Sequence, residues 1–236
     1  MQWVFSSIDL LHCVLQTANY MSTILLLLIV VGVGVYFLLK FLRNVQPTDD
    51  EVDQDLKELK NKVKHFKGGF IPWTDAISSN QIDQILTKDN ARSGNGVFLS
   101  SAGDPIFAYA YKNYIGPGQN AVIYILTLEN EYIFRITNKG TEVFVNNEKK
   151  GLIRENGTFY DLKNDAVAQI KRYGASNVNK IYIGEEEIAK IALPDAIASQ
   201  TLEITKLELT ELEKNTVRMI AVYDLVNSID QAEENS

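Results

Sequence analysis

Short β-rich runs fill most of the chain between residues 97 and 207, and they restrict the fold more than any other feature. The runs are separated by turn sequences such as Gly-Pro-Gly, Asn-Lys-Gly and Asn-Asn. Turns this short favour hairpins between neighbouring strands. We expect eleven strands, near residues 97–100, 105–112, 121–127, 131–136, 141–145, 149–154, 157–160, 166–171, 179–183, 187–192 and 201–207. So many consecutive strands predict an antiparallel barrel or sandwich.

The chain ends in a helix that is apolar on almost every face. Thr210 and Glu213 form a capping box that predicts a helix over 211–229. Between Val217 and Val226, eight of ten residues are apolar or Tyr, and such a helix needs to be enclosed. The predicted fold is therefore mainly β with helices. An antiparallel β-barrel of about eleven or twelve strands forms the domain 68–229 around this C-terminal helix, and 230–236 is an acidic tail.

Residues 21–41 predict a single transmembrane helix. Met21–Leu39 contains nineteen residues without a charge, which is close to the roughly 30 Å needed to cross a bilayer. Lys40 and Arg43 follow this segment, so we expect the N-terminus outside and the C-terminal domain in the cytosol. The preceding residues, 1–20, predict a short segment that lies in the membrane interface.

A charged stalk helix is expected over residues 47–67. Thr48 and Glu51 form its capping box, and its apolar residues follow a heptad spacing: Val52, Leu56, Leu59, Val63 and Phe66. Two interpretations fit this spacing. The residues form the seam of a short coiled coil that pairs subunits, or a single helix rests its apolar stripe on the following domain; two heptads do not decide between them.

A second short helix is expected just after the stalk, from Asn80 to Lys88. Ser78 or Ser79 can cap it, and its apolar residues share one face: Ile82, Ile85 and Leu86.

The composition excludes several classes of function. The chain of 236 residues has a net charge of -7, which argues against a nucleic-acid partner. One cysteine and two histidines cannot form a zinc site of four cysteines, a zinc site of two cysteines and two histidines, or an internal disulfide. They leave His12 or His65 as the base of any Ser-His or Cys-His mechanism. There is no P-loop. We therefore expect no enzyme activity, no cofactor and no metal.

The densest basic clusters are the candidates for a ligand site. They consist of Lys149, Lys150 and Arg154, and of Lys171 and Arg172. An anionic lipid head group could use them if the strands bring them together. The alternative is that they are solvated hairpin charges that keep the sheet edges from associating.

The segments GTEVFVNNEKKGLIRENGTFYDLKNDAVAQIKR and IYIGEEEIAKI, followed by the apolar C-terminal helix, resemble the tubby C-terminal-like superfamily over residues 97–229. That superfamily includes tubby proteins, phospholipid scramblases and LURP-one-related proteins. The resemblance implies a twelve-stranded barrel around a central hydrophobic helix. It also implies action at membranes, through basic residues that bind phosphoinositides or by movement of lipids between leaflets. The sequence departs from the scramblases because its predicted membrane helix precedes the barrel and it lacks a Pro-rich N-terminal segment.

Three functional hypotheses follow. The first is a single-pass, membrane-anchored, non-enzymatic binding module whose cytosolic barrel engages an anionic lipid head group or a protein partner. The second is a structural or assembly subunit of a larger membrane complex, with no ligand of its own. The third is a scramblase-like lipid mover. The expected partners are the lipid bilayer, an anionic lipid, and either a second copy of the chain or a membrane-complex subunit.

Overall fold

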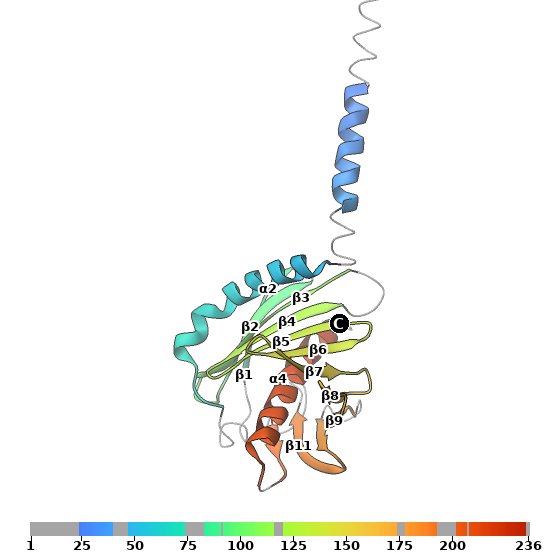
Figure 1. Cartoon of the computed structure of the whole chain (residues 1–236). Helices are drawn as coiled ribbons and strands as arrows, with labels where there is room; N and C mark the ends of the chain where they lie inside the picture. The colour runs from blue at the N-terminus through green and yellow to red at the C-terminus, as the bar shows by residue number, and fades with distance from the viewer. Residues whose placement is uncertain are drawn as a thin grey trace, which may run out of the picture. The chain divides into compact units, whose positions relative to one another are not determined.

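The computed structural model (Figure 1) describes residues 24–39, 47–73, 83–90, 92–115, 120–173, 178–192, 202–206 and 208–234. The chain divides into two compact units, Met1–Pro47 and Thr48–Ser236. The second unit contains the sheet and the helices that pack on it. The predicted interfacial segment 1–20 lies outside the described residues.

The first unit contains a helix over residues 24–39 whose apolar side chains are exposed. Among the described residues, no helix combines the length and the apolar character that a membrane crossing requires. This finding contradicts the predicted transmembrane helix 21–41. It also contradicts the predicted single-pass localisation with an outer N-terminus and a cytosolic C-terminal domain.

Helix α2 (Asp49–Val63) forms within the range predicted for the charged helix. The predicted capping box is present: the Thr48 hydroxyl accepts from the Glu51 backbone N–H at 3.4 Å, and the Glu51 carboxylate accepts from the Thr48 backbone N–H at 2.9 Å. Acidic residues in the first turn and lysines in the last turn complement the helix dipole. A 3-10 helix, η1 (Lys64–Gly69), follows.

Among the described residues, twelve antiparallel strands form one sheet in which the order in space follows the order along the chain. Each of the eleven predicted strand ranges overlaps one of the observed strands β2 to β12. The strands are β1 (Asp83–Asn90), β2 (Ser93–Leu99), β3 (Pro105–Asn113), β4 (Ala121–Thr127), β5 (Glu131–Thr137), β6 (Gly140–Val145), β7 (Glu148–Ile153), β8 (Thr158–Asp161), β9 (Ala166–Lys171), β10 (Val178–Ile183), β11 (Glu186–Ala192) and β12 (Leu202–Ile204).

Strand β1 replaces the helix that the sequence predicts from Asn80 to Lys88. Its residues pair with β2 in antiparallel register from Asp83 opposite Leu99 onward. Pairing with β2 satisfies backbone groups that would otherwise be left open at the edge of the sheet, and this tertiary contact outweighs the local helical spacing. The helix prediction was therefore wrong.

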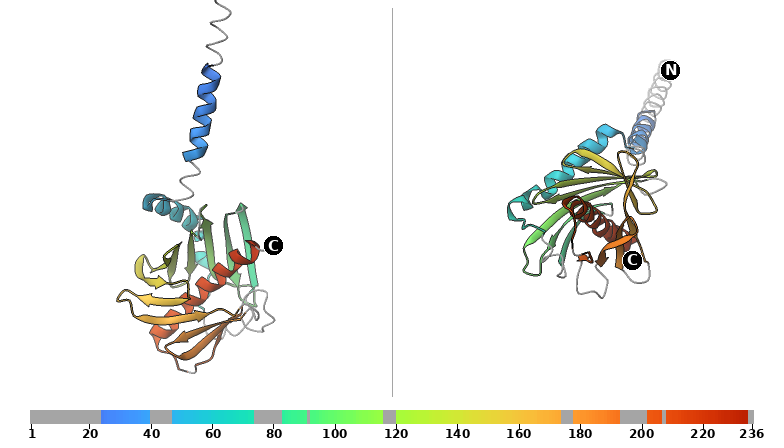
Figure 2. Two further views of the ribbon diagram at one scale, coloured as in Figure 1. Left: turned by 90° about the vertical axis from the view of Figure 1, so that its right-hand side faces the viewer. Right: turned by 60° about the horizontal axis from the view of Figure 1, so that its bottom comes forward.

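The sheet is open, which contradicts the predicted closed β-barrel. No pairing joins β1 to β12 among the described strands; β1 pairs with β2, and β12 pairs with β11. Helix α4 (Glu211–Glu234) lies along the concave side of the curled sheet (Figure 2). The apolar residues of the inner face are thus buried against α4 without closure, so the hydrophobic effect does not require a continuous ring of strands.

Strand β4 shows why the centre of the sheet is apolar on both faces. Ile123 and Ile125 belong to the inner core with α4, whereas Val122 and Tyr124 belong to the outer core with α2. Successive residues of a strand point to opposite faces, so a strand covered on both sides reads as a continuous apolar run. Figures 1 and 2 show α2 on the outer face and α4 on the inner face of the sheet.

Helix α4 occupies the inner core. Every residue from 216 to 227 is buried except Arg218, which is half-buried. This burial matches the sequence, in which the same stretch is apolar on nearly every face. The helix continues to Glu234 and so includes residues that the sequence assigns to an acidic tail.

Candidate functional site

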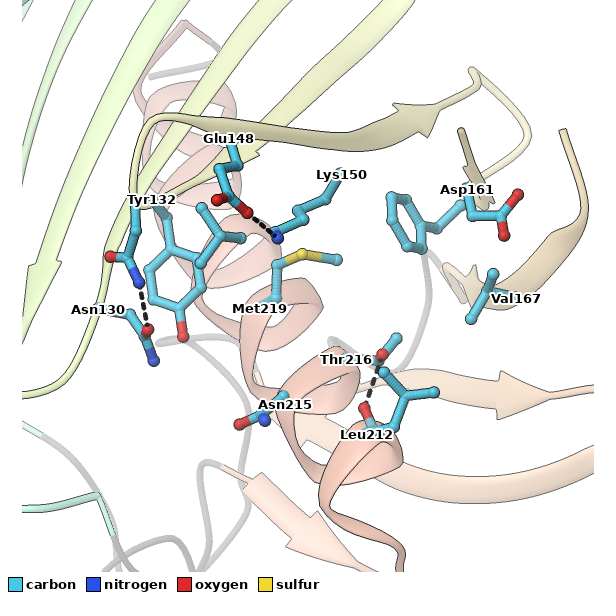
Figure 3. A pocket seen from close by; sticks show the side chains of 13 residues that line it. Asn130, Tyr132, Glu148, Lys150, Asp161, Val167, Leu212, Asn215, Thr216 and Met219 are labelled. Atoms are coloured by element: carbon cyan, nitrogen blue, oxygen red, sulfur yellow. Dashed lines mark hydrogen bonds and ion pairs between the residues drawn. The ribbon is translucent and has the colours of Figure 1, made fainter. Parts of the chain in front are cut away.

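A pocket of about 540 Å³ lies between the first turns of α4 and the hairpins of β5 to β9 (Figure 3). Its apolar lining consists of Tyr132, Val145, Phe159, Val167, Leu212 and Met219. Its polar lining consists of Asn130, Asn146, Glu148, Lys150, Asp161, Asn215 and Thr216. A concave site of this volume with a mixed lining is typical of small-molecule sites.

Helix α4 contributes one face to the pocket. Leu212, Asn215, Thr216 and Met219 follow the spacing i, i+3, i+4, i+7, so they lie on the same side of the helix, as Figure 3 shows. The capping box sets the start of this face, because the Glu213 carboxylate accepts from the Thr210 backbone N–H at 2.7 Å. The pocket therefore begins in the first turn of α4.

A two-residue turn builds the opposite wall. Asn146 and Asn147 join β6 to β7 with φ angles of 52° and 66°, the left-handed conformation that a tight hairpin requires and that asparagine tolerates. This turn places the Asn146 amide so that it accepts from the Glu131 backbone N–H at 2.9 Å and donates to the Asn130 side chain at 2.9 Å. The wall is therefore held by hydrogen bonds between two hairpins.

Tyr132 continues this wall. Burial raises the pKa of its hydroxyl above the ordinary value of 10.0; the hydrogen bond with Asn130 and the charge of Arg218 act in the opposite direction. Tyr132 therefore keeps its proton and acts as a neutral hydrogen-bonding group instead of a base.

Four other polar side chains of the pocket, Glu148, Lys150, Asp161 and Thr216, are engaged within the protein. Glu148 and Lys150 form an ion pair at 2.7 Å, and Lys150 holds the pKa of Glu148 below its ordinary value. The Thr216 hydroxyl donates to the Leu212 carbonyl at 2.9 Å, and Asp161 accepts from two backbone N–H groups of the turn that follows it. This arrangement suits the binding of a largely apolar molecule more than proton transfer.

The basic residues that the sequence singles out do not form one patch. Lys149 pairs with Glu142 and lies over the Phe144 ring on the outer face of the sheet, whereas Lys150 lines the pocket. The Arg154 guanidinium lies 4.2 Å from the centre of the Tyr160 ring.

The second basic cluster is also divided. Lys171 lies over the Tyr182 ring at 4.3 Å, whereas the neighbouring Arg172 bonds to Asp224 of α4 at 3.1 Å. Asp224 is 1% exposed and also accepts from the Asn179 amide at 2.6 Å. Arg172 therefore contributes to helix packing, and of the five candidates only Lys150 lines the pocket.

The heptad residues of α2 pack inside the chain. Val52, Leu59 and Val63 are buried against the outer face of the sheet, and Leu56 and Phe66 pack on the same cluster half-buried. The described contacts correspond to the second interpretation of the spacing, a helix that rests on the following domain. A coiled coil would have to use the same residues.

Sequence reasoning did not find the pocket. Its lining comes from separate hairpins and one helix, and residues such as Asn130 and Val167 carry no motif that links them. The Asn-Asn turn and the Thr210 capping box are visible in the sequence, but each predicts only a local structure.

No family model, curated protein or solved structure matches the chain. The resemblance to the tubby C-terminal-like superfamily therefore stays a prediction. In the part of the chain that the structure describes, no three His, Cys, Asp or Glu residues lie together in a group that could hold a metal ion.

Proposed function

We propose that the sheet domain is a binding module that takes a small, largely apolar molecule into the pocket between α4 and the β5–β9 hairpins. The observation that carries this proposal is the pocket itself, whose volume of about 540 Å³ lies within the range of small-molecule sites. Glu148 pairs with Lys150, whereas Thr216 and Asp161 bond to backbone groups, so we expect these polar groups to orient a ligand instead of reacting with it. We propose binding without catalysis.

The mouth of the pocket supports this proposal. Leu212 lines the pocket, yet its side chain is 74% exposed. A ligand that covers this side chain would remove apolar surface from water, which favours binding. Leu162, in the turn after β8, is similarly exposed at 67% but does not line the pocket. The two leucines therefore make a matched pair for mutation.

Binding of the neutral fluorescent probe phenylnaphthylamine to the full chain tests the proposal. Leu212→Ala should weaken binding by about threefold to tenfold because it removes apolar contact, and Leu162→Ala should leave it unchanged. Val167→Trp, which fills the pocket from β9, should abolish the saturable part of the signal. The test uses the saturable part of the signal because the exposed apolar helix 24–39 can also take up the probe.

Unfolding midpoints of all three variants serve as the control for folding. Equal binding by the native chain and by a folded Val167→Trp variant would contradict the proposal. The anionic head-group hypothesis predicts a different result: binding of anionic vesicles that is lost when Lys149, Lys150, Lys171 and Arg172 are changed to Glu.

A further inference from the structure

A second, smaller cavity of about 20 Å³ adjoins the pocket. Asn130, Tyr132 and Asn215 line both cavities, so the two lie next to each other. The other side chains of the small cavity include Trp73, Glu129 and Arg218. A space of this size holds one water molecule or one polar group of a ligand.

Trp73 lines this cavity and carries a buried side-chain donor without a partner. Its side chain is 9% exposed, and its Nε1 is the one buried side-chain nitrogen or oxygen without a partner in the described part of the chain. The ring is held by apolar contact, since it stacks on Phe107 with a centroid separation of 5.5 Å. Buried polar groups in native proteins are normally satisfied, and an indole nitrogen can only donate. An acceptor supplied by a ligand would satisfy this donor.

The charges around the cavity indicate which acceptor fits. Glu129 and Arg218 carry opposite charges, so the two together are neutral. In the adjoining pocket, Glu148 and Lys150 form a pair and Asp161 adds a negative charge. A carboxylate would add a further negative charge to this lining, whereas a carbonyl oxygen accepts a hydrogen bond without one.

We infer that the ligand is a neutral molecule with an apolar body and one carbonyl oxygen. The body occupies the pocket, and the oxygen accepts from Trp73 Nε1 in the small cavity. This inference rests on the proposed function, because it assigns the chemistry of the ligand that the pocket binds. A single water molecule in the small cavity would satisfy Trp73 in the absence of ligand, and the carbonyl oxygen would displace it.

Three probes of nearly equal shape test this inference on the full chain: methyl naphthyl ketone, ethylnaphthalene and naphthoate. Equilibrium dialysis should show that the ketone binds about threefold to tenfold more tightly than ethylnaphthalene, since they differ by one hydrogen-bond acceptor. Naphthoate should bind more weakly than the ketone because of its charge. Trp73→Phe should bring the ketone and ethylnaphthalene to equal affinity.

The indole N–H signal gives a second measurement that does not depend on removing Trp73. The chain has two tryptophans, so Trp3→Phe leaves Trp73 as the single indole in a nitrogen-labelled NMR spectrum. The ketone should move this signal downfield, and ethylnaphthalene should not. Equal binding of all three probes, or the same indole signal with ketone and ethylnaphthalene, would overturn the inference and leave the proposed function standing. Absence of pocket binding by every probe would overturn both.

Discussion

Helices α2 and α4 pack on opposite faces of the same sheet, and each carries one buried aspartate, Asp55 and Asp224. Helix α2 buries one stripe and exposes the other side, whereas α4 is buried on all sides over residues 216–227, apart from Arg218. The two helices thus carry the same buried polar group, a carboxylate, in different surroundings. The comparison separates what a buried carboxylate contributes from what the packing around it contributes.

The two carboxylates have similar partners. Asp55 accepts from Lys112 at 2.7 Å and from the Tyr114 hydroxyl at 2.9 Å. Asp224 likewise accepts from a cationic side chain, Arg172, and from a neutral donor, Asn179. Each aspartate therefore connects its helix to the sheet, and any difference between the helices should come mainly from their access to water.

The largest expected effect is loss of apolar packing in α4. Ile220→Ala should lower the free energy of unfolding by about 4 kcal/mol, and Leu59→Ala in α2 by about 3 kcal/mol. Both side chains are almost fully buried, but the cavity in α4 is surrounded by the core, whereas α2 at the surface can move to close its cavity. Urea-induced unfolding measures both values. An equal or larger loss for Leu59→Ala would show that α2 is as rigidly packed as α4.

The next effect in size is loss of the buried carboxylates. Asp224→Ala should lower the free energy of unfolding by about 3 kcal/mol, because it leaves the Asn179 amide without an acceptor inside the core. Asp55→Ala should lower the free energy of unfolding by about 2 kcal/mol, since its neutral donor, Tyr114, is 9% exposed and Asn179 is 4% exposed. Double-mutant cycles with Arg172→Ala and Lys112→Ala measure the coupling within each pair. Equal losses in the free energy of unfolding for the two aspartate variants would show that access to water does not distinguish the two sites.

The smallest effect concerns the start of α4 and depends on pH. Hydrogen bonds from Thr210 and then the contact with Lys206 hold the pKa of Glu213 below its ordinary value of 4.5. The unfolded chain therefore takes up this proton first as the pH falls. The contribution of Glu213 is complete above the unfolded pKa and is lost as the pH falls through the folded pKa.

Glu213→Gln should thus destabilise the protein at about pH 7, by less than either aspartate variant, and this difference should shrink as the pH falls below about 4.5. Thermal unfolding of native and variant protein across this range measures it. A difference that stays constant with pH would mean that the charge of Glu213 plays no part in the cap.

Local features were predictable because they depend on residues close in sequence. Both capping boxes form as expected, and all eleven predicted strand ranges overlap strands, since their alternation and turn residues act over a few positions. The burial of α4 also follows from its composition. The predicted helix at Asn80 to Lys88 was wrong because the open edge of β2 recruits the same residues as a strand.

The amino-acid sequence by itself thus determined the described strands other than β1, the turns, the helix caps and the need to enclose α4. The tertiary structure alone decided that the sheet stays open, that the heptad stripe of α2 packs on its own sheet, and that Lys149 and Lys150 lie in different surroundings. It also brought Trp73 next to the wall of Asn130, Tyr132 and Asn215. Hydrogen bonds within turns and caps act between near neighbours, whereas sheet closure, helix docking and pockets depend on contacts between residues far apart in the chain.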